Sequence, residues 1–193
     1  GLSRELGART PPSRREFPTP PPARPPPPRP AAIEVATDER LIEVGYGDWT
    51  GQSLRKLSRE PLWRVVQAHP SAVTFPGPGG ERLADIQRRA VAAIRDTNAR
   101  LGPEAVYLIC SHADVIKAIL ADSLGLHLDL YQRIQVDPCS LSVIRYTPLR
   151  PFVERMNDTG GNVKALIRSD KTTKAGAAGL RPGDAPVGGG AGG

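Results

Sequence analysis

The sequence is poor in cysteine and has no long apolar run. Cys110 and Cys139 are the only cysteines among 193 residues, and they show neither the density of a disulfide scaffold nor the paired spacing of a zinc site. This usage favours a reducing, cytoplasmic environment. No apolar run approaches the roughly 20 residues that a membrane-spanning helix needs, and the N-terminus lacks the apolar core of a signal peptide. We therefore expect a soluble protein with no membrane partner.

Positive charge is abundant, but it is concentrated at the two ends of the chain. The formal net charge is +6 and the sequence pI is about 9.7. Residues 1–30 carry a net charge of +4 and residues 164–193 a net charge of +3, which leaves −1 for the stretch between them. A near-neutral body with basic ends is typical of a folded domain with solvated tails. The composition therefore argues against nucleic acid as a main partner.

Both ends differ in composition from the middle. Residues 11–30 contain eleven prolines, each of which lacks a backbone donor and disfavours helix in the residue before it. Residues 1–30 are therefore predicted to be a disordered proline- and arginine-rich segment, and its "PPPPRP" run has the composition that proline-binding partners prefer. The Gly- and Ala-rich residues 164–193 are predicted to be a disordered tail. The folded domain is expected over residues 31–163.

Local signals inside these limits predict several helices. Ser53 is placed to cap a helix, and Pro61 is expected to kink that helix or to start a second one. Over residues 81–101, apolar side chains recur at intervals of three and four, which is the pattern of an amphipathic helix. The Gly-Pro pair that follows is expected to end it.

A strand and a helix are predicted next. Residues 105–110, "AVYLIC", form a short apolar run typical of a buried strand, and residues 113–126 have the pattern of a following helix. Residues 133–137 and 140–148 are predicted to form two further strands that are antiparallel neighbours. The order of these elements indicates a mixed α/β sheet with helices on its faces.

A candidate anion site lies where the apolar run meets the helix. Ligands of open α/β sheets collect beyond the carboxyl ends of the strands, where a helix presents unpaired N–H groups and a positive dipole end. Ser111, His112 and Ala113 occupy this point, and His112 would add a donor or a proton-transfer group. A capping or merely exposed histidine would show the same local pattern.

Glu43 is a second candidate, because it stands between the apolar residues Ile42 and Val44. A partly apolar setting raises the proton affinity of a carboxylate, as a general acid near neutral pH requires. A solvent-facing glutamate on an edge strand would have the same neighbours. The residues alone leave both interpretations open.

Four segments carry a resemblance to a known family. They are "DERLIEVGYGDWTG", "FPGPGGERLADIQRRAVAAI", "CSHADVIKAIL" and "SVIRYTPLRPFVERMNDTGG". In this order they resemble the histidine phosphatase superfamily, with its phosphoglycerate mutase-like fold, and in particular its small phosphatase or phosphomutase branch. The resemblance implies a three-layer α/β/α sheet and a small phosphorylated substrate. It also implies phosphate-ester hydrolysis or phosphoryl transfer through a phosphohistidine, without a metal or other cofactor.

The resemblance also implies roles for particular residues. Glu43 is expected to protonate the leaving group, and His112 is expected to hold the phosphate. Ser111 and Ala113 are expected among the substrate-binding residues. The family usually has glycine where this chain has Ala113, so the added methyl group is expected to crowd the phosphate.

The sequence departs from the family at the nucleophile. The family's Arg-His-Gly motif should precede Glu43, whereas the three histidines of this chain are His69, His112 and His127. We therefore expect a sheet that is incomplete at the N-terminus and a truncated, locally frame-shifted product with impaired activity. The alternative is a non-catalytic phosphate-binding or scaffold module that recruits a partner through its proline-rich segment.

Overall fold

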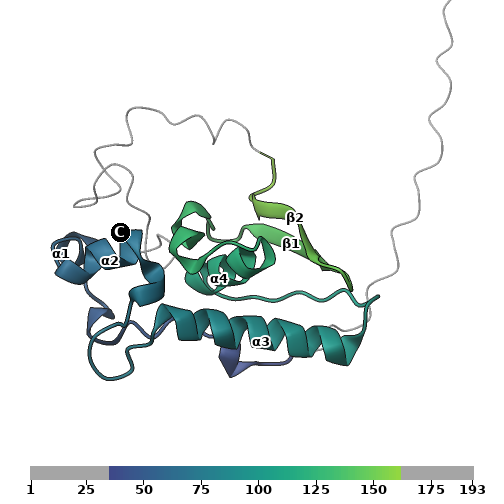
Figure 1. Cartoon of the computed structure of the whole chain (residues 1–193), viewed down its shortest axis with the longest axis horizontal. Coiled ribbons are helices and arrows are strands. Elements are labelled where there is room, and N and C mark those ends of the chain that lie inside the picture. The colour runs from purple at the N-terminus through teal and green to yellow at the C-terminus, as the bar shows by residue number, and fades with distance from the viewer. Residues whose placement is uncertain (1–34, 162–193) are drawn as a thin grey trace, which may run out of the picture. The chain divides into compact units, whose positions relative to one another are not determined.

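The computed structural model describes residues 35–161. The predicted disordered segments, residues 1–30 and 164–193, lie outside this range. Helices and one small sheet follow one another along the described part (Figure 1). In chain order the elements are η1 (Glu39–Leu41), η2 (Gly47–Trp49), α1 (Leu54–Leu57), α2 (Pro61–Ala68), η3 (Pro70–Ala72), α3 (Leu83–Leu101), α4 (Ala113–Ser123), η4 (Leu128–Arg133), β1 (Leu141–Tyr146) and β2 (Pro151–Asp158), where η marks a 3-10 helix.

Local signals account for the boundaries of the first three α-helices. The Ser53 side chain accepts a hydrogen bond from the N–H of Lys56 and caps α1. Pro61 is the first residue of α2, where its missing N–H breaks no helical hydrogen bond. α3 ends at Gly102, whose φ of 87° is disfavoured for residues with a Cβ. The helices predicted from these signals are confirmed.

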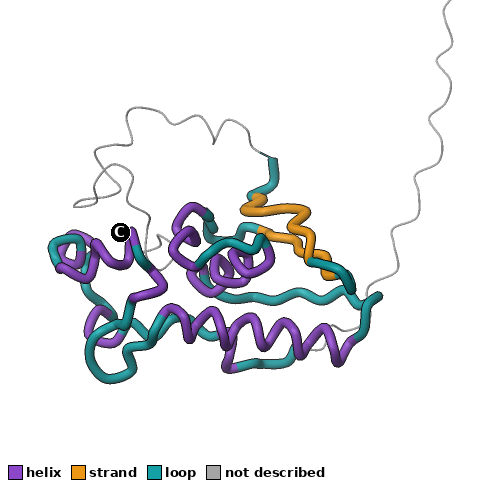
Figure 2. The backbone as a smooth tube through the Cα atoms, in the orientation of Figure 1, coloured by secondary structure: helices purple, strands orange, loops and turns teal. Residues whose placement is uncertain are grey.

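The sheet of the described part is a hairpin of β1 and β2 (Figure 2). The two strands are antiparallel, and Tyr146 pairs with Pro151 next to the connecting turn. The strand predicted over residues 140–148 is confirmed as β1, but the strand predicted over residues 133–137 is wrong. Ile134 and Val136 are buried without belonging to a strand, so their alternation reflects core packing after η4.

The prediction of a buried strand over residues 105–110 is also wrong. The described residues form no ladder with this segment, which Figure 2 shows as loop. Val106 is 98% exposed and Leu108 is 75% exposed. Tyr107, by contrast, donates a 2.8 Å hydrogen bond to Asn98 of α3. A strand is buried on both faces only when other elements cover both faces. Within residues 35–161, only the face of this segment that carries Tyr107 is covered.

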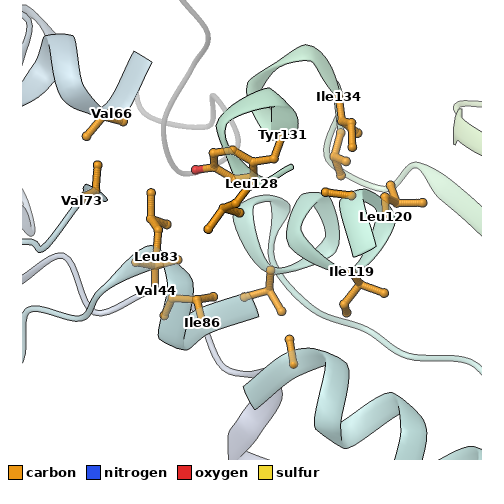
Figure 3. Packing of buried hydrophobic residues seen from close by; sticks show 14 of the residues in the cluster. Val44, Val66, Val73, Leu83, Ile86, Ile119, Leu120, Leu128, Tyr131 and Ile134 are labelled. Atoms are coloured by element: carbon orange, nitrogen blue, oxygen red, sulfur yellow. The ribbon is translucent and has the colours of Figure 1, made fainter. Parts of the chain in front are cut away.

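The hydrophobic core draws on nearly every element of the described part (Figure 3). Val66 from α2, Ile86 from α3 and Val115 from α4 are fully buried. Tyr131 from η4 is 1% exposed and packs with them. Packing between helices, rather than strand pairing, therefore holds the described part together.

We expect Ile86→Ala to lower the free energy of unfolding by about 2–5 kcal/mol, the usual cost of truncating a fully buried aliphatic side chain. Leu101→Ala, at the end of the same helix, is the matched control. Leu101 is 43% exposed, so its truncation should cost less than about 1 kcal/mol. Urea denaturation followed by circular dichroism measures both values. Equal losses in the two variants would contradict this assignment of the core.

Candidate functional site

Glu43 and His112 are far apart in the sequence but lie side by side in the fold. The Oε2 atom of Glu43 is 3.5 Å from the Nδ1 atom of His112. The two side chains are 31% and 52% exposed, so the pair is open to solvent on one side. The structure thus brings together the two residues that the sequence analysis singles out as the acid and the phosphate-holding histidine.

The start of α4 lies at this pair. His112 is the N-terminal cap residue of α4, and Ala113 is its first helical residue. The first N–H groups of a helix lack intrahelical partners and carry the positive end of the helix dipole. The hydroxyl of Ser111 donates a 2.7 Å hydrogen bond to the carbonyl of Leu41, so Ser111 joins the two segments that carry the pair. Contact of Ser111 and Ala113 with a substrate stays a prediction.

Two glycines allow the loop after Glu43 to pack against the backbone of the loop that precedes α3. A Cβ atom on Gly45 would overlap a backbone carbonyl oxygen of that second loop, and one on Gly47 would overlap the carbonyl oxygen of Pro76. Gly47 also has a φ of 53°, which other residues rarely adopt. The N–H of Glu81 donates a 2.8 Å hydrogen bond to the carbonyl of Gly45. The glycine-rich loops therefore support each other as a pair.

Arg89 of α3 fixes the backbone at Glu43. Its guanidinium donates hydrogen bonds of 2.6, 3.0 and 3.1 Å to three backbone carbonyl oxygens just before and at Glu43. It also makes two 3.1 Å contacts with the carboxylate of Glu81. The Oε2 atom of Glu81 in turn accepts a 2.8 Å hydrogen bond from the N–H of Gly45. One ion pair therefore holds the chain on both sides of the candidate acid.

Arg89 and Glu81 are residues of the candidate site that the sequence analysis missed. Charged residues follow the whole polar face of α3, so charge alone does not distinguish Arg89. Its position is the one useful signal, because it lies three residues after the fully buried Ile86 and directly before the fully buried Ala90. The neighbouring side chain of Arg88 is 78% exposed. Arg89 thus borders the apolar stripe, where its guanidinium can reach inward.

The carboxyl group of Glu43 is tuned by its surroundings. Burial is the largest influence and raises its pKa, while the hydrogen bond from the N–H of Val44 to its Oε1 atom lowers it. The negative charge of Asp114 raises the pKa further, and the charges of His112 and Arg89 lower it. The net result is a pKa above the ordinary value of a glutamate, so this carboxyl keeps its proton at higher pH than a solvated one.

The other two histidines belong to a different region. The Nδ1 atom of His127 is 3.4 Å from the Oδ2 atom of Asp129. The pKa of Asp129 is lowered chiefly by a hydrogen bond from the N–H of Ser71, with smaller contributions from His127 and His69. Both histidines thus lie around Asp129, between η3 and η4. Within residues 35–161, no group of three His, Cys, Asp or Glu side chains is arranged to hold a metal ion.

Comparison with known proteins identifies relatives of this chain. The family model of the histidine phosphatase superfamily, branch 1, matches residues 28–159. "Bifunctional protein Rv2228c" of Mycobacterium tuberculosis is 30% identical over 134 residues, which are 68% of this chain and 36% of that protein. "Probable phosphoglycerate mutase GpmB" of Yersinia enterocolitica is 31% identical over 117 residues, which are 59% of this chain and 53% of that protein. The chain therefore spans about a third to a half of the length of these curated relatives.

Two solved structures have a similar fold. YhfR of Bacillus stearothermophilus matches with a TM-score of 0.54 and 26% identity, over 63% of this chain and 60% of that one. A phosphoserine phosphatase variant of Entamoeba histolytica, in complex with phosphoserine, matches with a TM-score of 0.56 and 18% identity, over 66% of this chain and 64% of that one. The predicted α/β, phosphoglycerate mutase-like fold is thereby confirmed. No helix of the described part is long and apolar enough to span a membrane.

We expect Arg89→Ala to lower the free energy of unfolding by about 2–3 kcal/mol, because it removes several hydrogen bonds made by a charged donor. It should also speed hydrogen exchange at the N–H of Gly45. This N–H donates to Glu81, which would lose its ion pair with Arg89. Arg88→Ala is the control. Its side chain is exposed and pairs with Asp85, so its loss should cost no more than about 0.5 kcal/mol. Similar effects of the two changes would show that Arg89 does not hold this loop.

Glu43→Gln should change how folding stability depends on pH. Because the pKa of Glu43 is higher in the folded chain than in the unfolded chain, the folded state binds the extra proton. The contribution of Glu43 to stability is therefore present at low pH and is lost as pH rises through its folded pKa. The glutamine side chain of the variant cannot ionise, so the variant should not show this loss of stability as pH rises. Urea denaturation between about pH 4 and pH 8 measures it, and a difference between the two proteins that did not vary with pH would contradict the raised pKa.

Proposed function

The chain belongs to the histidine phosphatase superfamily, branch 1, and on this premise we propose that its Glu43–His112 site acts on phosphate esters, by hydrolysis or phosphoryl transfer. Superfamily membership supports phosphatase- or mutase-type chemistry and suggests a small phosphorylated substrate. The single observation that carries the proposal is the 3.5 Å approach of Glu43 Oε2 to His112 Nδ1, at the N-terminus of α4.

His112 and the first turn of α4 are suited to hold phosphoryl oxygens. A phosphoryl group at this point would accept hydrogen bonds from the imidazole and from the N–H groups that open the helix, including that of Ala113. Ser111 supports this position through its hydrogen bond to Leu41. Enzymes accelerate phosphoryl transfer mainly by alignment and charge stabilisation. Here the imidazole of His112 and the N–H groups at the start of α4 would provide both.

Glu43 is suited to protonate the leaving oxygen. A carboxyl with a raised pKa holds its proton at a higher pH than a solvated one, which is what a general acid needs. Arg89 fixes the main chain at Glu43, so the acid has a defined place. Because His112 lies next to Glu43, the proton would be delivered on the side where the phosphate is held.

The covalent step of a phosphohistidine mechanism needs a nucleophilic imidazole in addition to His112. The other histidines of this sequence, His69 and His127, lie around Asp129 instead. Binding and acid catalysis can persist when a nucleophile is missing, at a much lower rate. We therefore propose that this chain by itself binds phosphate esters and turns them over slowly or not at all.

We expect His112→Ala to abolish saturable binding of phenyl phosphate to the full chain, because the change removes one of the two groups that would hold the phosphoryl oxygens. Isothermal titration calorimetry measures the affinity. His127→Ala is the matched control, since this histidine is exposed and pairs with Asp129. It should leave the affinity unchanged.

Hydrolysis of p-nitrophenyl phosphate by the same preparations distinguishes an enzyme from a binding module. Turnover that is lost in both His112→Ala and Glu43→Gln would support catalysis at this site. Binding without turnover would favour the non-catalytic phosphate-binding module. Equal binding by the parent chain and His112→Ala would contradict both and place any phosphate contact elsewhere.

A further inference from the structure

A buried ion pair begins two residues after His112. Asp114 and Lys117 lie one turn apart on α4, and their side chains are 0% and 2% exposed. The Oδ1 atom of Asp114 is 3.2 Å from the Nζ atom of Lys117. Charged side chains are seldom buried to this extent, and they are stable there only when they are paired and hydrogen-bonded. A hydrophobic pair of similar size would often be at least as stable, so packing alone does not account for this one.

Tyr46 connects the ion pair to the loop that carries Glu43. Its hydroxyl donates a 2.9 Å hydrogen bond to the Oδ2 atom of Asp114. The two oxygens of Asp114 thus bind one group from the loop and one from α4. The ring of Tyr46 also packs edge-on against Phe75, with 5.1 Å between the ring centroids. Tyr46 follows Gly45 in a closely packed backbone, so displacing its side chain would also displace the loop.

Lys117 is held on its other side by η4. Its Nζ atom donates a 3.3 Å hydrogen bond to Oε1 of Gln132 and lies 5.6 Å from the centroid of the Tyr131 ring. The amide of Gln132 donates in turn to the carbonyl of Val66 in α2. The network therefore runs from the Glu43 loop through α4 to the core. Networks of this kind are rigid when their members are satisfied.

We propose that Asp114 is a positioning residue for the Glu43–His112 pair, a role that rests on the function proposed above. Its buried carboxylate, paired with Lys117, holds the hydroxyl of Tyr46. It thereby sets the loop that carries Glu43 against the start of α4, where His112 lies. Asp114 acts through Tyr46 rather than on the substrate.

The charge of Asp114 acts on Glu43 as well. Burial is the largest cause of the raised pKa of Glu43, and the negative charge of Asp114 adds to it. Asp114 therefore favours the protonated form that a general acid requires. Further charged or titratable groups near Glu43 include His112 and Arg89, which lower its pKa, and the phenols of Tyr46 and Tyr131. Glu81 pairs with Arg89, and Lys117 pairs with Asp114.

Asp114→Asn and Tyr46→Phe, made in the full chain, test this role. Carbon-13 NMR titration of the Glu43 carboxyl reports its pKa, and calorimetry with phenyl phosphate reports affinity. We expect Asp114→Asn to lower the pKa of Glu43, and both changes to weaken binding about fivefold, the effect of one lost hydrogen bond. The control is Asp122→Asn, further along α4, where the carboxylate pairs with the exposed Arg95. It should leave both quantities at the parent values.

A second variant covers the case in which Asp114→Asn fails to fold because Lys117 is left unpaired. The double variant Asp114→Asn/Lys117→Met removes both charges at similar volume. A smaller fall in the Glu43 pKa is expected, because the positive charge of Lys117 is lost together with the negative charge of Asp114. An unchanged pKa in the folded variants would overturn the proposal, even with reduced stability. If the parent chain failed to bind phenyl phosphate, the proposed function would be wrong, while the Glu43 titration would still decide the role of Asp114.

Discussion

The guanidinium of Arg89 is the contact on which the candidate acid depends. The chain leaves the 3-10 helix η1 at Ile42 and has no strand partner before Glu43 in the described part, so its carbonyl oxygens need other donors. Arg89 donates to the carbonyl oxygens of Arg40, Ile42 and Glu43. Glu81 balances the charge and accepts from Gly45. An ion pair between Arg89 of α3 and Glu81 of the preceding loop thus takes the place of a sheet contact.

The distance between Glu43 and His112 is set by several independent contacts. Ser111 bonds the carbonyl of Leu41 just before Glu43, and Asp114 bonds Tyr46 just after it. These contacts flank His112 at the start of α4, one at the surface and one in the core. Holding reacting groups in place before substrate arrives is a main source of catalytic rate. The arrangement is what such pre-organisation requires, even though each contact alone is modest.

Sequence patterns predicted the parts of this structure that depend on neighbouring residues. The cap at Ser53, the start at Pro61 and the periodicity of α3 are local, and the matching helices are present. The strands predicted over residues 105–110 and 133–137 failed because a strand depends on a partner elsewhere in the chain. Local patterns made Glu43 and His112 candidates, with a structural interpretation left open for each, and the family resemblance implied their roles. Arg89 and Asp114 were missed because the contacts that define them join distant segments and follow no period.

Within residues 35–161 the segment before the site has no strand partner, so the position of the site depends on α4 more than on a sheet. Val106 and Leu108 are exposed, and no described strand pairs with residues 105–110, so strand pairing in the described part does not set the position of their C-terminal end. α4 begins directly after this end, and its Val115 is fully buried in the core. The buried Asp114–Lys117 pair fixes the same turn. The imidazole of His112 is therefore held by the helix that follows it.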